Sequence, residues 1–157
     1  MLFSGESMFS GVNYLNADSK NRVTIPARHR DVLQNTITEA TKLIITLDSR
    51  QCLFAYPESI WDSVRVKVEN LPNTNPLIKS YQRLILGSAE AVEIDKAGRL
   101  LIPAALRNMV GIDGEVALVG MGSKLEIWKK KKWEAEINKA LDASGDDLAE
   151  LLNGLSI

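Results

Sequence analysis

The chain has 157 residues, of which 45% are hydrophobic and 25% are charged, a composition that is typical of a folded globular protein and excludes wholesale disorder. Its formal net charge of -1 excludes proteins that coat nucleic acid through a large basic excess, so any anionic partner has to be bound by a local basic patch. No apolar stretch approaches the length of a membrane span, and the N-terminus lacks the pattern of a secretion signal, so we expect neither a membrane protein nor an exported one.

The first segment, residues 1–11, is expected to be an N-terminal extension that leads into the fold. A first module is predicted over residues 12–59, and its leading strand ends at the turn from Asp18 to Arg22. Asn21 is a residue type that tolerates positive φ, which favours a tight, hairpin-like turn. The carboxylate of Asp18 is predicted to hold this turn, or the Arg22 guanidinium, in place by hydrogen bonds.

Pro26 suits the first position of a short helix, where its missing N–H costs nothing. Beyond this helix, apolar runs predict strands at residues 43–47 and 53–56. Cys52, the single cysteine, lies at the start of the second run and is expected to be a buried structural thiol in a reducing cytoplasm. A helical linker is predicted over residues 60–87, where hydrophobic residues recur at helical spacing.

A second module, residues 88–131, is predicted because the chain repeats itself. Residues 95–107 align without gaps on residues 18–30, and Asp, Arg, Ile, Pro, Ala and Arg recur at matching positions. Asp95 and Gly98 take the positions of the first module's aspartate and asparagine. The second turn is therefore predicted to have the same shape as the first.

The helix of the second module is predicted to begin at Pro103 and to end at Gly111, a natural C-cap residue. Two further strands follow, as in the first module. Residues 132–157 are predicted to form C-terminal helices. In the last of these, Asp146 and Asp147 precede leucines that could form an amphipathic face seeking a partner surface.

The two turns carry the candidate binding residues. Residues 18–30 contain four basic residues and one aspartate, a local balance of +3, and residues 93–107 contain three basic residues and two acids, a balance of +1. Arginine suits bidentate contact with guanine edges or phosphate, whereas lysine acts as a point charge on the backbone. Arg22 and Arg99 are therefore predicted to be the central contacts with DNA. Phosphate-contacting lysines and further arginines complete the candidate set: Lys20, Lys96, Arg28, Arg30 and Arg107.

Several of these features are also compatible with a purely structural role. An Asp-x-x-Gly-Arg turn alone is a common solvated hairpin, and its duplication together with the Ile-Pro-Ala sequel is what favours a functional role. The lysine run at residues 129–132 is more typical of a solvated helix face than of a second DNA contact. His29, the single histidine, has no ligand-type neighbour at metal-binding spacing, so neither a metal nor a cofactor is expected. No nucleophile–base pair or phosphate-binding glycine loop predicts an enzyme.

Jointly, these motifs resemble those of the MraZ family of bacterial regulators, which carry two SpoVT-AbrB-type modules. The resemblance runs from Met8 to about residue 155, and its most specific parts are residues 8–11, the two turns with their Pro-Ala sequels, and residues 84–89. Asn21 departs from the glycine that is usual in the family's first turn. The resemblance implies a β-rich α+β fold, a pseudo-symmetric swapped-hairpin β-barrel built from two fused modules with flanking helices.

The resemblance also implies a function. Family members are ring-forming homo-oligomers that bind repeated sites in the promoter of the division and cell-wall gene cluster, which includes their own gene. The leading hypothesis is therefore a sequence-specific DNA-binding repressor, expected in the cytoplasm and on the nucleoid. The alternative is a protein-interaction module of the antitoxin type, which would hold a partner protein with its C-terminal segment, residues 146–157.

Overall fold

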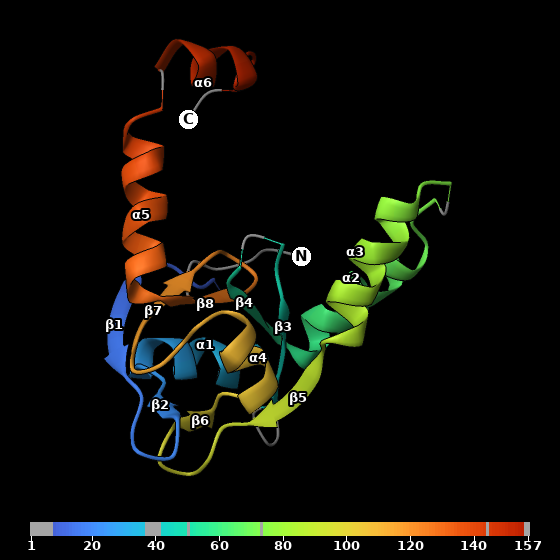
Figure 1. The fold of residues 1–157 in the computed structure, drawn as a ribbon. Coiled ribbons are helices and arrows are strands. Elements are labelled where there is room, and N and C mark those ends of the chain that lie inside the picture. The colour runs from blue at the N-terminus through green and yellow to red at the C-terminus, as the bar shows by residue number, and fades with distance from the viewer. Residues whose placement is uncertain (1–7, 37–41, 50, 73, 144, 156–157) are drawn as a thin grey trace.

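The computed structural model describes residues 8–36, 42–49, 51–72, 74–143 and 145–155. The order of two strands, a helix, two strands and then helices occurs twice along the chain (Figure 1). The strands are β1 (Val12–Asn16), β2 (Arg22–Thr24), β3 (Lys42–Leu47), β4 (Leu53–Pro57), β5 (Glu90–Glu93), β6 (Arg99–Leu101), β7 (Glu115–Gly120) and β8 (Leu125–Lys129). The helices are α1 (Ala27–Thr36), α2 (Glu58–Glu69), α3 (Pro76–Gly87), α4 (Ala104–Met109), α5 (Lys130–Leu141) and α6 (Gly145–Leu151).

The two halves of the chain exchange their first strands. β1 pairs antiparallel with β7 of the second half, and β5 pairs antiparallel with β3 of the first half. Together with the central antiparallel pair of β4 and β8, these ladders give a six-stranded sheet in the order β1-β7-β8-β4-β3-β5. This order is unchanged when it is reversed and the halves are interchanged, so a pseudo-two-fold axis relates them.

The antiparallel sheets and their helices confirm the predicted α+β fold. Within the described residues, the paired strands form one six-stranded and one two-stranded sheet, so a closed barrel stays a prediction. The division of the chain at residue 11 also stays a prediction. Phe9 is nevertheless part of the packed structure, because its side chain is only 3% exposed and its N–H donates to the Gly122 carbonyl at 2.8 Å.

The second sheet is a short ribbon in which β2 of one half pairs with β6 of the other. Its centre is the pair of Val23 and Leu100, which point inward and belong to the main hydrophobic core. Because side chains alternate between the faces of a strand, the flanking residues point outward. These outward residues, which lie opposite one another in two pairs, are Arg22 with Leu101 and Thr24 with Arg99.

Both short helices begin one residue later than the sequence predicts. The carbonyl of Pro26 accepts the first helical hydrogen bond, from Arg30 N–H at 3.1 Å, and Pro103 does the same for Arg107 N–H at 2.8 Å. Each proline is thus the cap and not the first helical residue, since an N-cap carbonyl already accepts the first helical bond while its backbone is still extended. Gly111, after the second helix, has the expected positive φ of 71°.

The remaining helices extend away from the sheet. α2 and α3 form a protruding pair, joined where Gln82 Nε2 donates to the Val68 carbonyl at 2.9 Å (Figure 1). The side chain of Asn75 caps α3 by accepting from Leu77 N–H. α5 leaves the sheet on the side opposite the β2–β6 ribbon and leads to α6 (Figure 1). No helix in the described part of the chain is long and apolar enough to span a bilayer.

Candidate nucleic-acid interface

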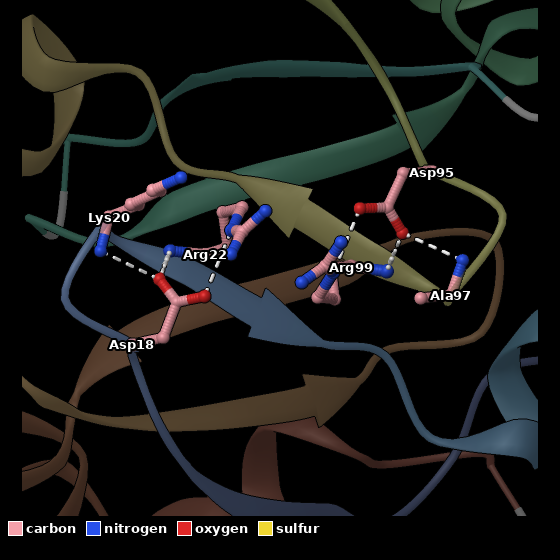
Figure 2. A network of polar contacts seen from close by, with 6 residues as sticks. All are labelled: Asp18, Lys20, Arg22, Asp95, Ala97 and Arg99. Atoms are coloured by element: carbon pink, nitrogen blue, oxygen red, sulfur yellow. Dashed lines mark hydrogen bonds and ion pairs between the residues drawn. The ribbon is translucent and has the colours of Figure 1, made fainter.

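The first turn is held by the carboxylate of Asp18. Its Oδ1 accepts hydrogen bonds from the backbone N–H groups of Lys20 and Arg22, both at 2.9 Å, while its Oδ2 accepts from Arg22 Nε at 2.9 Å (Figure 2). The backbone closes the turn as well, because Asn21 N–H donates to the Asp18 carbonyl. Asn21 has a φ of 62°, the left-handed conformation that asparagine tolerates. Asp18 thus bonds both to the backbone of the turn and to the Arg22 side chain, and its predicted role in positioning them stays a prediction.

The second turn repeats this arrangement bond for bond. Asp95 Oδ1 accepts from the N–H groups of Ala97 at 2.9 Å and Arg99 at 2.8 Å, and Oδ2 accepts from Arg99 Nε at 2.9 Å (Figure 2). Gly98, with a φ of 81°, takes the place of the asparagine. The two turns also bond to each other's modules, since Ile25 N–H donates to the Gly98 carbonyl and Ile102 N–H to the Asn21 carbonyl.

These bonds keep the aspartates ionised and fix the arginines. Donation from the Arg22 backbone N–H lowers the pKa of Asp18, and donation from the Arg99 backbone N–H lowers the pKa of Asp95. Each guanidinium is held at Nε, and its two terminal nitrogens make no hydrogen bond to the described part of the protein. An arginine with a fixed stem and free terminal nitrogens can make a bidentate contact with guanine or phosphate.

The ribbon brings the two arginines together. Arg22 and Arg99 lie on the same outward face, and their side chains lie between the two aspartates in Figure 2. Both are partly exposed, with 27% and 38% of their side-chain surfaces accessible. The carboxylates neutralise part of their charge, and the terminal nitrogens remain donors that make no hydrogen bond to the described part of the protein.

Two residues of this outward face, Thr24 and Leu101, are absent from the sequence-based prediction of the site. Both are exposed, and Leu101 has half of its surface accessible. Period-two alternation from each arginine would have located them, because the residue two positions along a strand shares its face. What the sequence could not provide was the pairing of β2 with β6, which places each of them opposite the other half's arginine.

The other predicted arginines make contacts within the protein. Arg28 donates through Nη2 to the Asn13 side chain, and its guanidinium lies over Gly11. Arg30 lies against the second turn, since a Cβ at Gly98 would come within 2.8 Å of its Nη1. Arg107 donates through Nη1 to the Ile102 carbonyl at 3.2 Å. They therefore support the turns and strands, whereas their predicted contact with DNA stays a prediction.

The predicted lysines lie on the two turns but not at equivalent places. Lys20 and Lys96 are both exposed, and the repeat aligns Lys20 with Ala97 and Ser19 with Lys96. The lysine run at residues 129–132 begins α5, on the side of the sheet away from the ribbon (Figure 1). Lys130 forms an ion pair with Glu115 at 2.9 Å and Lys132 donates to the Val110 carbonyl at 3.2 Å, so these two lysines make contacts within the protein.

The single histidine and the single cysteine are both buried. His29 is buried against the Phe9 ring, and burial, followed by the Arg28 charge, lowers its pKa. Cys52 is a buried free thiol, and burial raises its pKa, so its thiolate form is disfavoured at neutral pH. Within the residues that the structure describes, no group of three or more His, Cys, Asp or Glu side chains could hold a metal ion.

Comparison with known proteins gives matches along nearly the whole chain. Residues 8–84 and residues 85–152 each match the family described as "MraZ protein, putative antitoxin-like". A protein named transcriptional regulator MraZ in Chromobacterium violaceum is 43% identical over 150 residues, which cover 96% of this chain and all of that protein. Its namesake in Nitrosomonas europaea is 40% identical over the same coverage, and that in Neisseria meningitidis serogroup A is 43% identical over 90% of this chain and 93% of its own.

Proposed function

Because the chain belongs to the MraZ family of transcriptional regulators, we propose that it binds specific sites in double-stranded DNA through the outward face of the β2–β6 ribbon. The observation that carries the proposal is the pair of guanidinium groups held side by side by identical carboxylate bonds. Arg22 and Arg99 make the central contacts, and Lys20 and Lys96 contact phosphate. Non-enzymatic regulation fits the relatives' description as transcriptional regulators.

The geometry of the ribbon supports this choice of partner. The major groove admits a two-stranded β-ribbon, and arginine is the side chain best suited to the O6 and N7 acceptors of guanine. A ribbon with three residues in each strand presents few contacts, so one chain alone is expected to bind weakly. Several linked ribbons on adjacent repeats would multiply these affinities.

We therefore also propose a ring-like homo-oligomer that represses the division and cell-wall gene cluster, including its own gene, from repeated promoter sites. Exposed leucines on the helices that extend from the sheet support contact between copies, because they form apolar surface that the single chain leaves uncovered. They are Leu77 on α3, Leu141 on α5, and Leu148 and Leu151 on α6. α5 and α6 leave the ribbon free, because they extend from the opposite side of the sheet (Figure 1). Native mass spectrometry at micromolar concentration tests the oligomer, and a monomer would contradict it.

The closing test is footprinting on the DNA upstream of the protein's own gene, at two salt concentrations. We expect spaced protected repeats, with protection that weakens steeply as salt rises because bound phosphates release counterions. The double variant Arg22→Ala/Arg99→Ala should lose protection. The matched control Arg65→Ala/Arg83→Ala removes the same charge from the α2–α3 pair, far from the ribbon, and should keep it (Figure 1). Equal protection by both double variants would contradict the proposed interface.

The antitoxin-type alternative is favoured by one observation. No residue of α6 is buried, and its Leu151 is 82% exposed, so this helix has a face that a partner protein could cover. The double variant Leu148→Asp/Leu151→Asp distinguishes the functions. If DNA protection survives while a co-purified partner is lost, the C-terminal segment holds another protein.

A further inference from the structure

Leu101 is an exposed apolar side chain in the middle of the proposed polar interface. Half of its surface is accessible, whereas its strand neighbour Leu100 is fully buried in the core. Its direct partner across the ribbon is Arg22, and side chains paired in this way have Cβ atoms about 5 Å apart. Leu101 therefore places an exposed apolar side chain next to a guanidinium whose terminal nitrogens make no hydrogen bond to the described part of the protein.

The chemistry of the major groove offers one apolar group at the base edges. Guanine, cytosine and adenine present donors and acceptors there, whereas thymine adds its 5-methyl group. An arginine paired with guanine places its strand partner near the next base step, because successive bases are separated by about 3.4 Å. A leucine at that position would have its surface removed from water by a methyl group and would face an unsatisfied polar edge at any other base.

We propose that Leu101 determines specificity by packing on the 5-methyl group of a thymine beside the guanine bound by Arg22. This inference rests on the proposed function, since it assumes that the outward ribbon face enters the major groove. Charge argues against a protein partner at this face, because two guanidinium groups flank the leucine and an apolar protein surface would have to desolvate both.

The other half of the ribbon provides an internal comparison. Thr24 is related to Leu101 by the pseudo-two-fold axis and lies opposite Arg99. Its single methyl group offers less apolar surface than the leucine side chain, and its hydroxyl can bond to several bases. One ribbon should therefore depend strongly on a thymine methyl on its Leu101 side and weakly on its Thr24 side.

The test replaces thymine by deoxyuridine, which removes the methyl group and nothing else. First, a promoter fragment in which every thymine is replaced is compared with the normal fragment, and then single replacements locate the position. Wild-type protein should bind the substituted site about fourfold more weakly for each packed methyl group that is removed, the factor expected for one buried methyl-sized group. Leu101→Ser should bind the normal fragment more weakly and should keep only the weak sensitivity to the replacement that is expected from Thr24.

Met121→Ser is the matched control, because Met121 has the same 50% exposure but lies in the turn between β7 and β8, on the six-stranded sheet. It should keep both the affinity and the sensitivity to deoxyuridine. A cooperative thermal unfolding transition verifies that Leu101→Ser is folded, and native mass spectrometry verifies that its oligomeric mass is that of the wild-type protein.

Each outcome decides the matter. If wild-type protein binds both fragments equally while Arg22→Ala still weakens binding, the proposed function stands and the role of Leu101 is refuted. If Leu101→Ser keeps the full wild-type sensitivity to deoxyuridine, another residue contacts the methyl group and the assignment is wrong. If Leu101→Ser changes the oligomeric mass, Leu101 is a contact between copies. If wild-type protein binds neither fragment, the proposed function itself fails.

Discussion

The turns at Asp18 and Asp95 share one hydrogen-bond arrangement but differ in what covers them. In both, the carboxylate accepts two backbone N–H bonds and one bond from an arginine Nε. At the second turn, Arg30 from the other half packs over Gly98, where even a Cβ would be too close. At the first turn, Asn21 carries a full side chain at the same position. The aspartate and arginine thus set the shape of a turn, and neighbouring elements decide how much its tip can vary.

The largest expected effect tests whether the two turns are equal in function. Arg22→Ala and Arg99→Ala should each weaken specific binding by about ten- to a hundredfold, the range for removing one bidentate arginine–guanine pair. Because both arginines are fixed by the same bonds, the two losses of affinity should be similar at one salt concentration. Titration of a promoter fragment by fluorescence anisotropy measures both. A weaker affinity in only one variant would show that only one turn contacts a base.

The second-largest effect concerns the residue at the tip of each turn, which is Gly98 in one turn and Asn21 in the other. Gly98→Asn should destabilise the fold by about 2 kcal/mol, because it combines a strained positive φ of 81° with displacement of the Arg30 side chain. The reverse exchange, Asn21→Gly, should change the free energy of unfolding by no more than about 0.5 kcal/mol, since glycine accepts this φ freely. Urea denaturation compares them. Equal costs would mean that Arg30 does not constrain the second turn.

A third prediction compares the helices behind the turns, where His29 occupies the position of Leu106. Burial, together with Arg28, lowers the pKa of His29 below its usual 6.5, so the unfolded state binds a proton more readily than the folded state. Stability is therefore full above about pH 6.5 and falls below it by up to about 1.4 kcal/mol per pH unit, until the folded pKa is reached. His29→Leu should remove this slope in denaturation at a series of pH values. An unchanged slope would assign it to other groups.

The smallest effects concern the lysines, which lie at different places on the two turns. Lys20→Ala and Lys96→Ala should each weaken binding a few-fold, equally for specific and unrelated sequences, and reduce the salt dependence by about one phosphate contact. Lys79→Ala, on α3, is the control for loss of one charge. If only one of the two lysines changes the salt slope, the DNA backbone passes closer to that turn.

The turns themselves were predictable from sequence, because their geometry is set within five residues. Asp18 and Asp95 precede their arginines at a spacing that allows backbone and side-chain bonds together, and Asn21 and Gly98 are residue types for positive φ. The strand exchange was expected from family resemblance alone. No local pattern states that β1 pairs with β7, since that register joins segments about a hundred residues apart.

Side-chain contacts between the halves explain what the prediction lacked. Arg30 is among the predicted DNA contacts, and its position against Gly98 depends on how α1 packs beside the other module's turn, which charge alone does not indicate. Leu101 looked like an ordinary strand residue until β6 was paired with β2. Packing between the halves decides which basic side chains near the turns make contacts within the protein. Counting charges along the chain gives no information on that packing.

Strand exchange within one polypeptide has a consequence for symmetry. β1 and β5 each complete the sheet beside the other half, so the pair behaves as a dimer whose partners are covalently joined. In a homodimer of separate one-module chains, every substitution occurs in both turns at once, so the dimer keeps its two-fold symmetry. Here both turns belong to one chain, so a mutation can change one turn and leave the other unchanged. A single molecule can therefore acquire a direction along the duplex, and an array of such molecules can distinguish a site from its inverted copy.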